Sequence, residues 1–149
     1  MKPIAKTLMI CAFFISSYES NAQVTTAKSN LFDSYSSTVS CPKSELDKIF
    51  TTPEGRVLKL SFGNNFQFTG IVSSSIQRYS NLQSVIIKST TSTGLLLGIS
   101  KRTNDDNTIT YVGRIINQKY GDAFELKLDN TGNYFLNKIK TDDLIQDRE

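Results

Sequence analysis

The stretch Phe124-Glu125-Leu126-Lys127-Leu128 and the run after it, Asp129-Asn130-Thr131-Gly132-Asn133, decide the fold of this chain. In the first stretch a period of two places three apolar side chains on one face of an extended strand and two charged ones on the other. The second run contains the residue types that tolerate the backbone angles of tight hairpins. Together they predict a half-buried strand that ends in a short turn.

The same pattern extends back to Arg56 and forward to Lys140, with turn residues between the apolar runs. It predicts seven strands, at residues 56–62, 65–72, 82–89, 94–101, 108–116, 122–129 and 133–140. Because such short connections cannot cross over a sheet, consecutive strands are expected to pair antiparallel. Before the strands, Pro42 and the spacing of Leu46 and Ile49 predict one short N-terminal helix.

The strands also contain an internal repeat, in which residues 65–101 correspond to residues 108–140. Four glycines are among the matched positions, and all four are interpreted as structural: Gly70 with Gly113, and Gly94 with Gly132. A glycine inside a strand usually marks a bulge or a close approach of two backbones. Each copy is a three-stranded meander, which cannot bury its apolar face alone. The chain is therefore expected to fold as an all-β domain, either a sandwich or a partly open barrel.

The predicted core consists of the apolar side chains in the inward phase of these strands. Its members are Leu58, Leu60, Phe62, Phe66, Phe68, Val85, Ile87, Leu95, Leu97, Ile99, Ile109, Tyr111, Ile115, Phe124, Leu126, Leu128 and Ile139.

Residues 1–22 have the features of a secretory signal peptide in the usual order: two lysines, a short apolar run and the small-residue exit Ser20-Asn21-Ala22. Cleavage after Ala22 would export the protein to the periplasm or the extracellular space. No transmembrane segment is expected in the mature chain. That chain is expected to comprise a flexible Ser/Thr-rich leader at 23–41, a single β domain at 42–141 and a charged tail at 142–149.

The composition excludes several classes of chemistry. The 149 residues contain no histidine, which excludes the usual protease triads and imidazole-bound zinc. Without residues 1–22 the chain has 15 basic and 13 acidic side chains, and a net charge of +2 does not favour nucleic acid as a partner. No cofactor or metal is expected, because the pairs Asp105-Asp106 and Asp142-Asp143 lack the alternating ligands of a calcium loop.

Cys41 is the one cysteine left after cleavage, and it precedes the predicted helix. The positive end of that helix could lower the pKa of the thiol, but no histidine exists to act as its base. An isolated thiol without a catalytic role is the preferred interpretation, and a disulfide between two chains is the alternative.

Two connectors share the pattern Gln-basic-Tyr and supply the candidate binding residues, Arg78 with Tyr79 and Lys119 with Tyr120. If these loops lie at one end of the domain, the two pairs form a surface suited to an anionic group, a sugar face or an acidic peptide. The alternative is structural: each tyrosine closes a corner of its meander with its hydroxyl bonded to backbone, and each basic side chain is solvated.

One stretch resembles the propeptide region of secreted reprolysin-type metalloproteases. The resembling segments are Phe68-Thr69-Gly70-Ile71-Val72, Ser84-Val85-Ile86-Ile87 and Gly94-Leu95-Leu96-Leu97-Gly98-Ile99. The inhibitory cysteine of that family has no counterpart after these segments. The resemblance implies a prodomain-like inhibitor or a folding accessory of a secreted metalloprotease.

These observations favour a non-enzymatic binding or accessory domain that recognises a protein or a surface glycan. The prodomain-like inhibitor is the second hypothesis. A small hydrolase built on two carboxylates is the third, and it requires a cleft that brings two acids within about 10 Å of each other.

Overall fold

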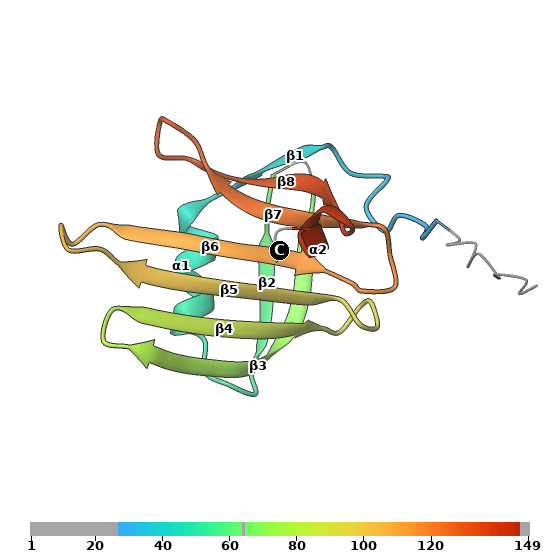
Figure 1. Cartoon of the computed structure of the whole chain (residues 1–149). Coiled ribbons are helices and arrows are strands. Elements are labelled where there is room, and N and C mark those ends of the chain that lie inside the picture. Colours follow the sequence, from blue (N-terminus) through green and yellow to red (C-terminus); the bar gives the residue numbers. More distant parts are fainter. Residues whose placement is uncertain (1–26, 64, 147–149) are drawn as a thin grey trace, which may run out of the picture.

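Figure 1 shows the computed structural model of the chain, which describes residues 27–63 and 65–146. The predicted signal peptide, residues 1–22, lies outside the described residues. In chain order the elements are β1 (Thr38–Cys41), α1 (Lys43–Thr51), β2 (Val57–Ser61), β3 (Gln67–Tyr79), β4 (Leu82–Ser89), β5 (Leu96–Thr103), β6 (Ile109–Ile116), β7 (Asp122–Leu128), β8 (Tyr134–Lys140) and α2 (Asp143–Gln146). Among the described residues, neither helix has the length and apolar character needed to span a membrane.

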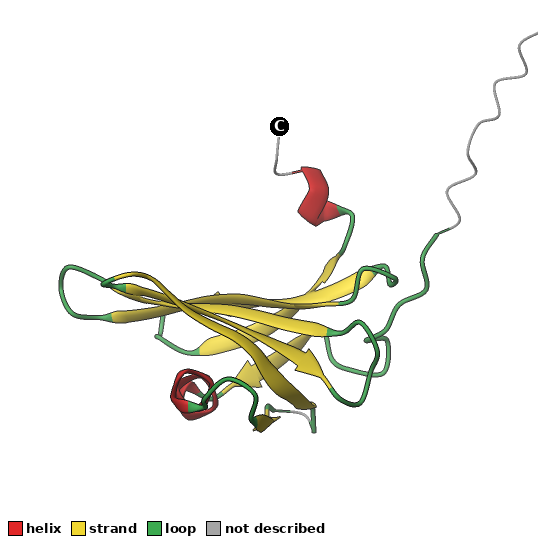
Figure 2. Ribbon diagram, turned by 90° about the horizontal axis from the view of Figure 1, so that it is seen from below, coloured by secondary structure: helices red, strands yellow, loops and turns green. Residues whose placement is uncertain are grey.

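The strands form one antiparallel sheet in the order β1-β8-β7-β6-β5-β4-β3-β2. Figure 2 shows that this sheet is curled, with α1 on its concave side and α2 on the other side. The N–H of Gly63, in the loop after β2, donates to the carbonyl of Ser40 in β1 at 2.8 Å. Because β1 and β2 are the two edges of the sheet, this bond joins the edges at one corner. The expected all-β antiparallel fold with a short N-terminal helix is confirmed, and it is a partly open barrel made of one sheet.

The expectation of a flexible leader at 23–41 is wrong for its last residues, because Thr38–Cys41 forms an eighth strand that pairs with β8. Upstream of β1, the Phe32 side chain is buried in the core. The backbone N–H of Phe32 donates to the carboxylate of Asp122 at 2.8 Å, which fixes this segment to the start of β7. Only two of the four β1 residues are apolar, so the alternation is too short to stand out in a segment rich in serine and threonine.

Strand β3 is longer than the predicted strand at 65–72. It continues to Tyr79 through a β-bulge between Val72 and Ser74. Three consecutive serines at this point break the apolar alternation, so the sequence pattern ends where the bulge begins. Beyond the bulge Ile76 pairs with Ser84 and is 45% exposed, on the face of the sheet opposite the core.

The core fills the concave side of the sheet, beneath α1. Its aromatic centre joins distant parts of the chain, since the ring of Phe124 lies 4.8 Å from that of Phe32 and 5.2 Å from that of Phe66. Most of the predicted core is confirmed as buried. Leu128, the last residue of β7, is the clear error at 49% exposed. Ile109 and Ile139 are only half-buried.

The two mid-strand glycines lie where neighbouring backbones come close. An ideal Cβ on Gly70 would lie 2.5 Å from the carbonyl oxygen of Lys88, and one on Gly113 would lie 2.8 Å from that of Gly98. Of the two interpretations of a glycine inside a strand, a bulge or a close approach, the close approach is therefore observed at both positions. Gly94 and Gly132 lie in turns with φ of +80° and +85°, a backbone region that favours glycine.

Candidate functional site

The inside of the barrel is packed. A void lined by side chains of α1 and the concave face has a volume of only about 10 Å³, which is no more than one water needs. A ligand of any size must therefore bind to the outside of the described fold. The outer face of the sheet is the candidate, because it exposes large apolar side chains: Ile71, Ile76, Tyr79, Ile86 and Val112.

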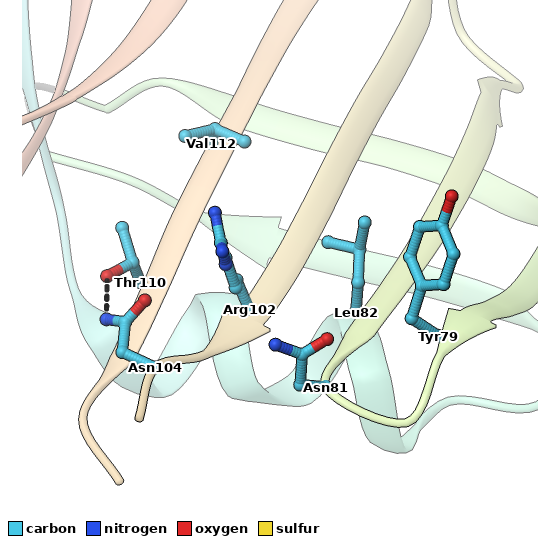
Figure 3. A pocket seen from close by; sticks show the side chains of 7 residues that line it. All are labelled: Tyr79, Asn81, Leu82, Arg102, Asn104, Thr110 and Val112. Atoms are coloured by element: carbon cyan, nitrogen blue, oxygen red, sulfur yellow. Dashed lines mark hydrogen bonds between the residues drawn. The ribbon is translucent and has the colours of Figure 1, made fainter. Parts of the chain in front are cut away.

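The first hollow on this face lies at the end of the β3–β4 hairpin and has a volume of about 460 Å³. We call it the Tyr79 pocket; its lining residues are Tyr79, Asn81, Leu82, Arg102, Asn104, Thr110 and Val112. Four of them form one row across the strands, since Tyr79 pairs with Leu82, Leu82 with Arg102 and Arg102 with Thr110. Figure 3 shows this row, with Leu82 between Arg102 and Tyr79. The register of two hairpins therefore places an aromatic ring and a guanidinium on either side of an apolar floor.

The polar groups of the Tyr79 pocket are partly fixed and partly free. The side-chain nitrogen of Asn104 donates to the hydroxyls of Thr108 and Thr110 at 3.0 and 2.9 Å. The side-chain nitrogen of Asn81 donates to the carbonyl of Thr103 at 3.3 Å. Both amide oxygens are left as acceptors without a partner among the described residues. The Arg102 guanidinium likewise makes no hydrogen bond or ion pair within the described part of the chain, so its donors are available.

A second hollow continues from the first, because both are lined by Thr110 and Val112. It crosses the outer face from β4 to β7 and has a volume of about 720 Å³; we call it the outer groove. Gly98 lines it, and an ideal Cβ on this glycine would meet no atom within 4 Å. The outer groove therefore has a bare stretch of backbone in its floor, with room for a group from a ligand.

Charged side chains line the β7 end of the outer groove. Glu125 lies between two cations, with a carboxylate oxygen 2.9 Å from the Arg114 guanidinium and the other 2.6 Å from Lys127 Nζ. The bond from Lys127 makes the largest contribution to a lowered pKa of Glu125, and the bond from Arg114 adds to it. The carboxylate is thus ionised and neutralised within the protein, and the surplus charge at this end of the groove is positive.

The structure separates the two predicted binding pairs. Successive strands run in opposite directions, so the β3–β4 hairpin that carries Arg78 and Tyr79 and the β6–β7 loop that carries Lys119 and Tyr120 lie at opposite ends of the sheet (Figure 1). The prediction that the two pairs form a single surface is wrong for a geometric reason. Each copy of the repeat contains three strands, an odd number, so equivalent strands of the two copies run in opposite directions and their equivalent loops lie at opposite ends. Of the four residues only Tyr79 lines the Tyr79 pocket, and the cation beside it there is Arg102.

Cys41 is buried, and burial raises the pKa of its thiol to about 12, with a further contribution from the charge of Glu45. The prediction that the positive end of the helix could lower the pKa of this thiol is therefore wrong.

Within the described part of the chain, the predicted acidic pairs do not form a metal site. The carboxylate of Asp106 accepts hydrogen bonds from the backbone N–H and the hydroxyl of Thr108 at 3.0 and 2.6 Å, as expected for a turn residue. The described residues contain no group of three or more acids and cysteines that could hold a metal ion.

The hydrolase hypothesis requires two neighbouring acids. No acid lines the Tyr79 pocket, and Glu125 is the one acid that lines the outer groove. Within the described residues, neither hollow therefore offers the carboxylate pair that this hypothesis needs.

No protein-family model, curated protein or solved structure matches this chain.

Proposed function

We propose that this protein is an exported, non-enzymatic binding domain that holds a surface glycan along the outer face of its sheet. The observation that carries the proposal is the Tyr79 pocket and its continuation into the outer groove. Across four strand spacings of about 4.8 Å, from β3 to β7, the combined surface is about 19 Å long. A polymer chain can follow such a surface, whereas an isolated small molecule would use only part of it.

The chemistry of the Tyr79 pocket suits a sugar. Tyr79 is 70% exposed, so one face of its ring is available to the apolar C–H face of a pyranose. The free amide oxygens of Asn81 and Asn104 can accept hydrogen bonds from hydroxyl groups, and Arg102 can donate to ring or hydroxyl oxygens. A sugar carries donors, acceptors and an apolar face on a single ring, which is the combination that these residues complement.

A protein partner is the second candidate, and one observation favours it. Ile76, Ile86 and Val112 expose 45%, 43% and 59% of their surfaces on the same face of the sheet. Neighbouring exposed aliphatic side chains are typical of protein contact surfaces. The inhibitor hypothesis stays a prediction from the sequence resemblance, tested by adding the purified domain to metalloproteases exported by the same cell.

The test uses immobilised polysaccharides from the cell surface and two variants at the end of β3. Tyr79→Ala removes the aromatic ring, and we expect it to weaken glycan binding at least tenfold. Arg78→Ala is the matched control, because Arg78 is the neighbouring exposed residue at the end of β3 but does not line the pocket. Equal affinities for the two variants would show that the site is misplaced. If the wild type retained no glycan while an exported protein crosslinked to a photoreactive group at Val112, the protein partner would replace the glycan.

A further inference from the structure

The cations along the Tyr79 pocket and the outer groove outnumber the acids. Three basic side chains, Arg102, Arg114 and Lys127, line the two hollows, against the single carboxylate of Glu125. Glu125 is already bonded to two of these cations. A ligand that follows the groove therefore meets a positive surface, and an anionic one is complementary to it.

Arg102 is the cation best placed to hold an anionic group. Its guanidinium has no partner among the described residues, and Figure 3 shows it between Thr110 and Leu82, beside the apolar floor. Adjacent strands lie about 4.8 Å apart, so Tyr79 and Arg102, on either side of Leu82, are separated by about 10 Å at their backbones. A sugar ring fits over Leu82 with its apolar face toward the tyrosine and an edge toward the guanidinium. The planar fork of an arginine matches a carboxylate in two parallel hydrogen bonds.

The two free amide oxygens restrict the kind of anion. Asn81 and Asn104 present acceptors in the same pocket as Arg102, and acceptors repel the oxygens of any anion. A guanidinium binds both oxygens of a carboxylate, whereas a sulfate or phosphate ester presents a third oxygen to the amide oxygens. The amide oxygens attract hydroxyl groups. The pocket thus suits a group in which one carboxylate lies next to several hydroxyls, and this is the arrangement in a uronic acid.

We infer that the glycan is acidic and that the Tyr79 pocket binds a uronic acid residue of it, with the carboxylate on Arg102 and ring hydroxyls on Asn81 and Asn104. This inference rests on the proposed function, since it names the sugar class for the same site. The remaining cations of the outer groove, Arg114 and Lys127, extend the positive surface along the following residues of the polymer. Binding should therefore weaken as the salt concentration rises.

The test is calorimetry on the full chain with three probes: an oligogalacturonate, its methyl ester and dextran sulfate. We expect the free acid to bind at least tenfold more tightly than the ester. Arg102→Ala should lower affinity for the acid about ten- to hundredfold, as expected for charge-assisted hydrogen bonds, and change affinity for the ester by less than threefold. Lys119→Ala is the matched control, because it removes one exposed cation at the opposite end of the sheet and should leave affinity unchanged.

The experiment distinguishes failure of the uronic acid inference from failure of the proposed glycan site. If the ester binds as tightly as the acid and loses affinity in Tyr79→Ala, the uronic acid is wrong and the glycan site stands. If dextran sulfate binds best and Lys119→Ala weakens it as much as Arg102→Ala, the attraction is general electrostatics and the inference is overturned. If neither the galacturonates nor the polysaccharides of the cell surface bind, both the inference and the proposed function fall. Circular dichroism of each variant verifies that the fold is retained.

Discussion

Replacing Gly70 with alanine should destabilise the fold strongly, because the added methyl group has no space. An ideal Cβ at this position lies 2.5 Å from the carbonyl oxygen of Lys88 and 2.7 Å from Cγ2 of Ile87. Both contacts are far shorter than the 3.5 Å or more at which non-bonded heavy atoms attract each other. Since the oxygen belongs to the backbone of β4, relief requires β3 and β4 to separate. Overpacking of this kind costs about 2–3 kcal/mol of the free energy of unfolding.

Gly98 provides the matched control, because alanine there meets no atom within 4 Å. Gly98→Ala should leave stability unchanged or raise it by about 0.5 kcal/mol, since alanine restricts the unfolded chain more than glycine does. Urea unfolding followed by circular dichroism measures both variants, with the midpoint lowered in Gly70→Ala and not in Gly98→Ala. A loss below about 0.5 kcal/mol for Gly70→Ala, or equal losses for the two variants, would refute the argument that the backbone of β4 leaves no room for a side chain at Gly70.

Burial raises the pKa of the Cys41 thiol to about 12, so iodoacetamide at pH 8 should modify it only after urea unfolds the protein, and rapid labelling of the folded chain would contradict this. Asp122→Ala removes the acceptor of the Phe32 N–H and should lower the free energy of unfolding by about 2–4 kcal/mol. Hydrogen exchange at the Phe32 amide should then accelerate, and unchanged protection would argue that Asp122 does not hold this segment in place. Because Lys127 helps to lower the pKa of Glu125 below its ordinary 4.5, the stabilisation from this carboxylate should be complete above pH 4.5 and disappear as the pH falls through the lowered value. Carboxyl NMR should show the Glu125 pKa rising in Lys127→Ala, and an unchanged value would discount that contact.

The antiparallel strands could be predicted because alternation and turn chemistry are local properties of the chain. The segment at 31–41 could not, since its partners come from distant parts of the sequence. Phe32 is held by Asp122, 90 residues further on, and β1 pairs with β8. Neither contact leaves a periodic signal, because the apolar residues of this segment are separated by irregular runs of serine and threonine. The bulge in β3 was missed for a related reason, because its serines interrupt the pattern on which the prediction relied.

Only part of the candidate site could be predicted. Tyr79 stood out because its connector is repeated, but the repeat misled about its companions: three strands per copy send Lys119 and Tyr120 to the far end of the sheet. Arg102 carries no motif. It reaches the pocket through the pairing of β4 with β5, which sets Leu82 opposite it. Register of this kind depends on tertiary packing, so a basic residue in the polar phase of a strand gives no sign of its function.

The central claim is that the outer face of the sheet, and not its interior or its β6–β7 end, holds an acidic glycan. NMR spectra of protein labelled at isoleucine and valine methyl groups, recorded during titration with an oligogalacturonate, test it most directly. The account predicts that the methyl signals of Ile86 and Val112 move, because both line the outer groove, while those of the fully buried Ile87 and Ile115 stay in place. Shifts confined to the interior methyls, or no shift at saturating oligosaccharide, would contradict it.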